Sequence, residues 1–299
     1  MKLLTFALAL ALTTTSLLLG QQQAAAQQDA AAKAQAILAQ TRTALGNEAK
    51  WKTLQSLTFS GKIRRVMGER EMEGELQFDL LLPDKLMKSE TIFPMPGIEI
   101  SRTEVLNGND IWSENNGGGG GNVVIRRGDD TPQGREMANR ASRAELLRVW
   151  LGCLLMPPAA AGLQFNFAGE AEAEDGKADV LEVKSADGFA ARLFIDQKSH
   201  HPLMLTYQGR QPRMMMAQST SGPPSEEEMQ KRIKEIEAQA AKAATVEFQM
   251  RFSEYREEGG ISFPHRISKS QGDQISEEWE LTKFKLNPSL KADRFEKKK

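Results

Sequence analysis

The chain has 299 residues, of which 40% are hydrophobic and 26% are charged. Its 39 Lys and Arg residues nearly balance its 40 Asp and Glu residues, so the composition lacks the basic excess of a nucleic-acid-binding surface, and we expect no nucleic-acid partner. There is a single cysteine, Cys153. An internal disulfide is therefore excluded, and an exported fold would rest on its hydrophobic core alone.

The first segment has the layout of a secretory signal peptide. Lys2 precedes an apolar run over residues 3–19, which is followed by three small residues at 24–26. This run is shorter and less uniformly apolar than a membrane-spanning helix of about 20 residues. We therefore expect residues 1–26 to be a signal peptide that is cleaved near Ala26, and the mature protein to be periplasmic or secreted. An uncleaved membrane anchor is the alternative.

An amphipathic helix is expected next, with Asp29 as its N-cap and Gly46 at its end. Apolar and small residues recur at helical spacing along it. This stripe consists of Ala34, Ile37, Leu38, Thr41, Ala44 and Leu45.

From residue 57 the apolar period changes to two, which is typical of antiparallel strands with one dry face. Segments 57–63 and 72–82 form the first pair, with a hairpin turn at 66–69. Further strands are expected at 85–93, 98–106, 111–114, 122–127, 163–168, 178–185, 189–196, 203–207, 246–252, 261–270 and 275–286. The five glycines at 117–121 are expected to form a loop, because a phosphate cradle would need a helix after it.

A second helix is expected over residues 133–156, where Pro157 and Pro158 end it. Its second half is apolar on most sides, which is typical of a helix buried against a sheet. Cys153 falls in this half and is expected to pack as a small hydrophobe.

Together these elements predict a mainly β (α+β) fold. A large curved antiparallel sheet would form an incomplete barrel from about 11 of these strands, closed by two helices on its concave face. We expect residues 27–299 to form a single domain with a helical insertion at about 210–244. The insertion is either a solvated arm or a mobile lid, in which Met214, Met215 and Met216 cover an apolar opening.

No catalytic motif stands out. The three histidines are His200, His201 and His265, and the chain has no HExxH, GxSxG or paired cysteines. Two adjacent histidines in a turn-rich stretch cannot face one side of a strand, and acidic runs usually form solvated faces. The pair at 64–65 is likewise interpreted as a solvated strand end. We therefore predict no catalytic residue, no metal site and no cofactor, and a protein that is not an enzyme.

The order of the elements resembles the LolA/LolB-like superfamily of outer-membrane lipoprotein-sorting proteins, in particular its divergent members. The segments that carry the resemblance are 34–46, 57–61, 74–78, 82–86, 105–108, 194–196 with 201–203, and 263–267. In that family an incomplete barrel, closed by helices, encloses an apolar cavity that accepts acyl chains. The glycine loop and the insertion depart from the family pattern, and no family arginine or lid residue matches a position here.

The resemblance implies non-enzymatic binding and transport of lipid or lipoprotein acyl chains in the bacterial envelope, with envelope membrane complexes as further partners. Apolar side chains of the strands and of the second helix would line the cavity. These residues are Leu57, Phe59, Leu76, Phe78, Leu80, Leu147, Leu151, Phe248, Met250 and Phe252. The alternatives are that the same side chains form an ordinary core, and that the fold serves as a protein-interaction or sensor module with the helix at 214–243 as its docking arm.

Overall fold

The computed structural model describes residues 5–68, 70–95, 97–118, 132–155, 157–173, 176–210 and 245–297. One 12-stranded sheet dominates the structure, in the order β5-β4-β3-β2-β1-β12-β11-β10-β9-β8-β7-β6. The elements are α1 (Thr5–Leu45), α2 (Glu48–Thr53), β1 (Ser56–Met67), β2 (Arg70–Leu81), β3 (Lys85–Met95), β4 (Ile98–Asn107), β5 (Asp110–Gly118), α3 (Pro132–Leu154), η1 (Ala159–Ala161), β6 (Gln164–Ala173), β7 (Gly176–Lys184), β8 (Ala190–Asp196), β9 (Pro202–Arg210), β10 (Thr245–Glu258), β11 (Ile261–Gln271), β12 (Gln274–Leu286) and η2 (Ala292–Phe295).

The sheet is open. Strands β5 and β6 lie at opposite ends of the strand order, and β1 is paired with both β2 and β12, which places the first and last strands side by side in the middle of the sheet. This confirms the predicted incomplete antiparallel barrel, with 12 strands in the described residues against about 11 expected. The strand expected at 122–127 lies outside the described residues. Gly117 and Gly118 were assigned to a loop, which is wrong, because they pair with β4 as the last residues of β5.

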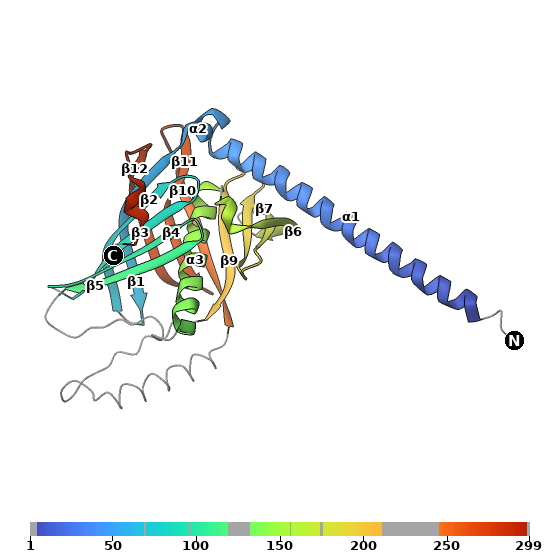
Figure 1. Ribbon diagram of the computed structural model, residues 1–299. Helices are drawn as coiled ribbons and strands as arrows, with labels where there is room; N and C mark the ends of the chain where they lie inside the picture. Colours follow the sequence, from blue (N-terminus) through green and yellow to red (C-terminus); the bar gives the residue numbers. More distant parts are fainter. Residues whose placement is uncertain are drawn as a thin grey trace, which may run out of the picture.

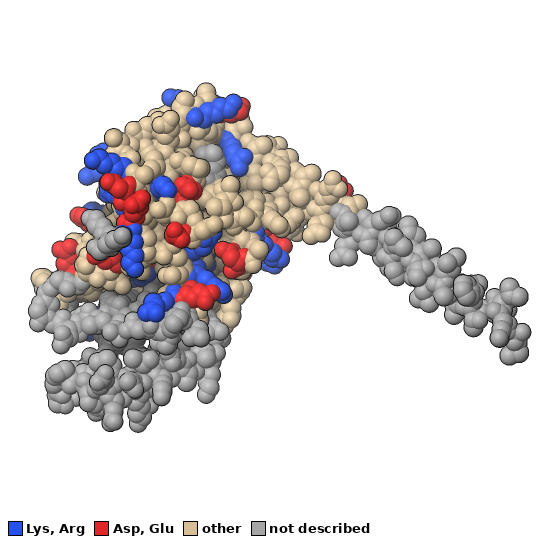
Figure 2. Space-filling model, viewed as in Figure 1, with Lys and Arg blue, Asp and Glu red and all other residues tan. Residues whose placement is uncertain are grey.

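The alternation in β2 explains why the sheet has a dry and a wet face. Leu76, Phe78 and Leu80 are buried, whereas Glu73 and Glu75 are exposed. On the wet face opposite charges meet across neighbouring strands. Figure 2 accordingly shows Lys and Arg interspersed with Asp and Glu over the sheet, without a large patch of one sign.

Helix α3 lies across the hollow of the curved sheet (Figure 1). The C-terminal half of α3 is buried on nearly all sides, as predicted, because it packs into the hollow of the sheet. The buried residues are Leu146, Leu147, Val149, Trp150, Leu151, Cys153 and Leu154. Gly152 permits the close approach, since a Cβ atom there would lie 2.0 Å from the Phe252 ring. Burial raises the pKa of the Cys153 thiol to about 12, so Cys153 acts as a small core residue.

Helix α1 lies along the edge strand β6. The predicted stripe is confirmed: Ala34, Ile37, Leu38, Thr41 and Leu45 are buried, and Ala44 is half-buried. Asp29 as an N-cap is wrong, because the helix starts at Thr5 and passes through this position, and Figure 1 shows its N-terminal end projecting away from the sheet.

The C-terminal part of α1 also contacts β6 and α2 through polar and charged groups. The Lys33 ammonium lies 3.5 Å from the centre of the Phe167 ring and 3.9 Å from Glu170. Helix α2, which the sequence pattern did not predict, buries Trp51, whose Nε1 donates a hydrogen bond of 2.9 Å to the Arg42 carbonyl. Among the helices that the structure describes, none combines the length and apolarity needed to cross a membrane.

A second, smaller core lies on the outer face of the sheet. Phe295 of η2 packs there on Met87 and Val105, and the Trp112 Nε1 donates to the Phe295 carbonyl at 3.0 Å. The C-terminal segment therefore covers the outer side of β3 to β5, opposite α3.

Candidate functional site

The apolar residues predicted to line a cavity come together on the inner face of the sheet. Leu57, Phe59, Leu76, Phe78, Leu80, Leu147, Leu151, Met250 and Phe252 all belong to one core cluster and are at most 3% exposed. Phe248 lies at the margin, half-buried and stacked on Tyr207 with ring centres 5.5 Å apart. In this structure α3 occupies the hollow that these strand residues line.

Aromatic rings contact one another at the centre of this interior. The Phe59 and Phe78 ring centres are 4.7 Å apart, and Phe78 and Trp279 follow at 5.3 Å. Such pairs contribute about 0.5–1.5 kcal/mol each beyond the apolar area that they bury.

The inner face is not apolar throughout, contrary to the pattern expected for a simple lipid-binding surface. Lys88 lies opposite Phe78 in the β2–β3 pair, and Glu90 lies opposite Leu76, so both charged side chains share the inner face. Lys88 is 4% exposed and Glu90 is 8% exposed. A buried charged region therefore adjoins the apolar one.

Ion pairs join the three strands β1, β3 and β4 in this region. The Lys88 Nζ lies 3.0 Å from Glu90 and 3.9 Å from Glu104, and Arg102 pairs with Glu104 at 2.6 Å. Arg65 reaches Glu90 at 3.3 Å. The assignment of residues 64–65 to a solvated strand end is therefore wrong for Arg65, which points inward.

The same network continues onto α3. Arg65 pairs with Glu277 at 2.6 Å, and the Lys269 Nζ lies 3.0 Å from Glu277. Lys269 also donates a hydrogen bond to Glu145 of α3, while Trp279 Nε1 donates to Glu277 at 2.7 Å.

Two further contacts tie α3 to the sheet. Ser142 donates a hydrogen bond of 2.6 Å to Glu104. The Arg148 guanidinium stacks on the Tyr207 ring at 3.5 Å and lies 3.5 Å from Glu145. Polar contacts thus dock the middle of α3, and apolar contacts dock its C-terminal half.

Five buried donors remain without a hydrogen-bond partner among the described residues, and two of them, the Nε atoms of Arg102 and Arg148, belong to side chains of this network. The others are the Nε atoms of Arg42 and Arg143 and the Nε1 of Trp150. Such groups are rare in folded interiors because each forfeits the water it would bind outside. The charged region therefore has unused hydrogen-bonding capacity.

Opposite charges favour the ionised forms of Glu90, Glu145 and Lys269. Burial alone would raise the pKa of Glu145, but Lys269, Lys88 and Arg148 outweigh it and lower the pKa to about 2. Burial would also raise the pKa of Glu90, but the positive charges of Lys88 and Arg65 outweigh this effect and lower the pKa to about 2. The carboxylates of Glu145 and Glu277 hold the pKa of Lys269 above its usual range despite burial.

We expect acid to destabilise the protein through these carboxylates. Because their pKa values in the folded protein are depressed, they add stability above about pH 4.5, the ordinary value, and this stability is lost as the pH falls toward 2. Urea unfolding at pH 7, 4 and 3 measures the effect. A midpoint that stays constant over this range would show that the network carries no pH-dependent stability.

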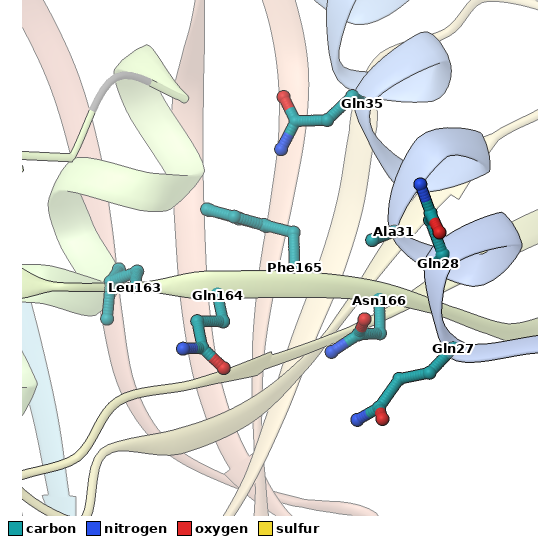
Figure 3. A pocket seen from close by; sticks show the side chains of 8 residues that line it. All are labelled: Gln27, Gln28, Ala31, Gln35, Leu163, Gln164, Phe165 and Asn166. Atoms are coloured by element: carbon teal, nitrogen blue, oxygen red, sulfur yellow. The ribbon is translucent and has the colours of Figure 1, made fainter. Parts of the chain in front are cut away.

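Two grooves lie outside the interior. One of about 530 Å³ lies between α1 and the edge strand β6, and Figure 3 shows Gln164 and Asn166 pointing to one side of the strand and Phe165 to the other. The other, of about 480 Å³, lies beside the C-terminal end of α1 and includes His201 and Glu257.

The histidines do not assemble a catalytic or metal centre in the part of the chain that the structure describes. His200 and His201 are half-buried in the turn before β9. His265 is buried, with its Nε2 3.1 Å from Glu258 and its Nδ1 3.2 Å from the Phe263 carbonyl. No three metal-binding side chains gather among the described residues. The proposed lid residues Met214, Met215 and Met216, with the insertion at about 210–244, lie outside them.

The geometry defines an open antiparallel half-barrel with a helix in its hollow and an interior that is part apolar, part charged. The fold is shared with a putative outer membrane lipoprotein-sorting protein domain from Vibrio parahaemolyticus, at a TM-score of 0.50 and 12% identity over 89% of this chain and 97% of that chain. The resemblance predicted from the sequence is thus confirmed at the level of the fold.

Two other solved structures are similar at lower scores. A DUF1329 family protein from Desulfovibrio piger has a TM-score of 0.48 and 9% identity over 89% of this chain and 97% of that chain. A LolA superfamily protein from Nitrosomonas europaea has a TM-score of 0.42 and 11% identity over 88% of this chain and 97% of that chain. No family model matches the chain, and no curated protein matches it.

Proposed function

We propose that this protein binds the acyl chains of lipids or lipoproteins inside the half-barrel and carries them within the bacterial envelope without chemical change. The observation that carries the proposal is the apolar inner face of an open sheet that is covered by a separate helix, α3, rather than closed by strands. The shared fold with a lipoprotein-sorting domain supports it.

The physical basis is an exchange of apolar contacts. Leu147 and Leu151 of α3 belong to the same core cluster as Phe78, Met250 and Phe252, and the Phe252 ring lies against Gly152 of this helix. An acyl chain gains about 0.8 kcal/mol for each methylene group that it buries. A chain of ordinary length can therefore replace much of what α3 loses when it leaves the hollow.

The proposal includes the cellular setting. Export by the segment 1–26 with cleavage near Ala26 would place the protein in the envelope, where membrane complexes would deliver and receive the lipid. The mature domain would then consist of residues 27–299, with Gln27 as its first residue.

Protein purified from the envelope tests this function. We expect native mass spectrometry to show a bound lipid mass, and the delipidated protein to take up a fluorescent fatty acid. Protein that carries no lipid and also fails to take up the fatty acid would refute the proposal.

A further inference from the structure

We infer that the ligand carries an anionic headgroup, a phosphate or a carboxylate, and that Glu145 of α3 occupies the headgroup's position when no ligand is bound. The inference rests on the proposed function and specifies its ligand class. It comes from the buried charged region beside the apolar residues.

The sheet contributes an excess of positive charge to this region. Its inward cations are Arg65, Lys88, Arg102 and Lys269, and its inward carboxylates are Glu90, Glu104 and Glu277. Three carboxylates thus face four cations. Glu277 is shared between Arg65 and Lys269, so the sheet alone offers Lys269 only part of a counterion.

Helix α3 supplies the second carboxylate that faces Lys269, and it also brings Arg148, which lies 3.5 Å from that carboxylate on the same helix. Glu145 accepts a hydrogen bond from Lys269 and faces Lys88 and Arg148 electrostatically. If α3 leaves the hollow to admit an acyl chain, it removes this carboxylate from Lys269. Leaving a largely buried ammonium short of its counterion is costly, and a ligand that brings its own anion avoids that cost.

The position suits an amphiphile. Lys269 lies opposite Met250 in the β10–β11 pair, and Lys88 lies opposite Phe78 in the β2–β3 pair. An anion held between these two ammonium groups therefore leaves its alkyl chain beside the apolar residues. The Nε of Arg102 is a buried donor without a partner, and it gives additional headgroup oxygens a hydrogen bond to accept.

The test compares amphiphiles that share a twelve-carbon chain and differ in headgroup. They are dodecyl phosphate, dodecanoate, dodecyl maltoside and dodecyltrimethylammonium, each titrated below its micelle concentration and measured by native mass spectrometry or calorimetry. We expect the two anionic compounds to bind the full chain at least 10-fold more tightly than the neutral and cationic ones. Phosphate and carboxylate are the two sources of the same chemistry, and the tighter of the two names the headgroup.

The variant Glu145→Gln sharpens the test because it keeps the shape of the side chain and removes the competing charge. Because Glu145 also helps to hold α3 in the hollow, the ratio of affinities is the measure: we expect the affinity for dodecyl phosphate or dodecanoate to rise about 10-fold more than the affinity for dodecyl maltoside. Glu136→Gln, at an exposed position of the same helix that pairs with Arg140, is the matched control and should change neither.

The outcomes separate the two proposals. Equal affinity for all four headgroups, in the original chain and in Glu145→Gln, would overturn the headgroup inference and leave acyl-chain binding standing. A preference for the cationic compound would also overturn it. No binding of any of the four would overturn both.

Discussion

Replacing Lys269 with alanine should lower the free energy of unfolding by about 3–5 kcal/mol, the usual cost of breaking a buried ion pair from one side. Lys269 is the cation that faces both Glu145 of α3 and Glu277 of β12. Its loss leaves two carboxylates, 19% and 10% exposed, with too little compensating charge. Arg65 stays with Glu277, whereas Glu145 keeps only Arg148 as an ion-pair partner, together with the charge of Lys88.

Urea unfolding followed by tryptophan fluorescence measures this change. Lys283→Ala, at an exposed position of β12, is the matched control and should cost less than about 0.5 kcal/mol. The double variant Lys269→Met with Glu145→Met removes both charges and should recover much of the loss, since apolar residues can replace a buried pair. Equal midpoints for Lys269→Ala and Lys283→Ala would contradict the buried network.

The substitution Phe78→Ala should cost about 3–5 kcal/mol, as large-to-small changes of buried aromatic residues do. Phe78 is fully buried and its ring lies between Phe59 and Trp279. Removing it deletes both stacking contacts and leaves a cavity at the centre of the sheet. The surrounding strands are hydrogen-bonded on both sides and cannot collapse into that space.

Thermal and urea unfolding of Phe78→Ala give the size of this effect. Phe93→Ala on β3 is the control, because Phe93 is 47% exposed and lies beside Glu73 on the outer face. We expect the control to stay within about 0.5 kcal/mol of the original chain. A Phe78→Ala protein as stable as the control would show that these rings are not packed as described.

The strands and the buried stripe of α1 were predictable because their signals are local. Alternation in β2 separates the buried Leu76 and Phe78 from Glu73, Glu75 and Gln77 within a few residues. The stripe from Ala34 to Leu45 repeats at helical spacing in the same way. Such patterns need no knowledge of the partner surface.

The charged interior was not predictable because strand register decides it. Lys88 and Glu90 alternate in phase with Leu86 and Ile92, which hints at an inner face, but a charge at these positions usually signals a solvent-facing strand. Their partners come from distant segments: Arg65 and Glu277 are 212 residues apart in the chain. Likewise, nothing near Phe295 indicates that it packs on the outer face against Met87.

Whether acyl chains enter the hollow that α3 occupies can be measured by fluorescence quenching with a fatty acid brominated along its chain. Bromine quenches a tryptophan that it contacts. Of the four tryptophans, Trp150 and Trp279 lie in the inner core, Trp51 of α2 packs at the end of α1 with its Nε1 bonded to the Arg42 carbonyl, and Trp112 lies on the outer face with Phe295. We expect strong quenching that Trp112→Phe retains and that Trp150→Phe with Trp279→Phe abolishes. Quenching that disappears with Trp112→Phe and persists without the two inner tryptophans would contradict binding in the hollow.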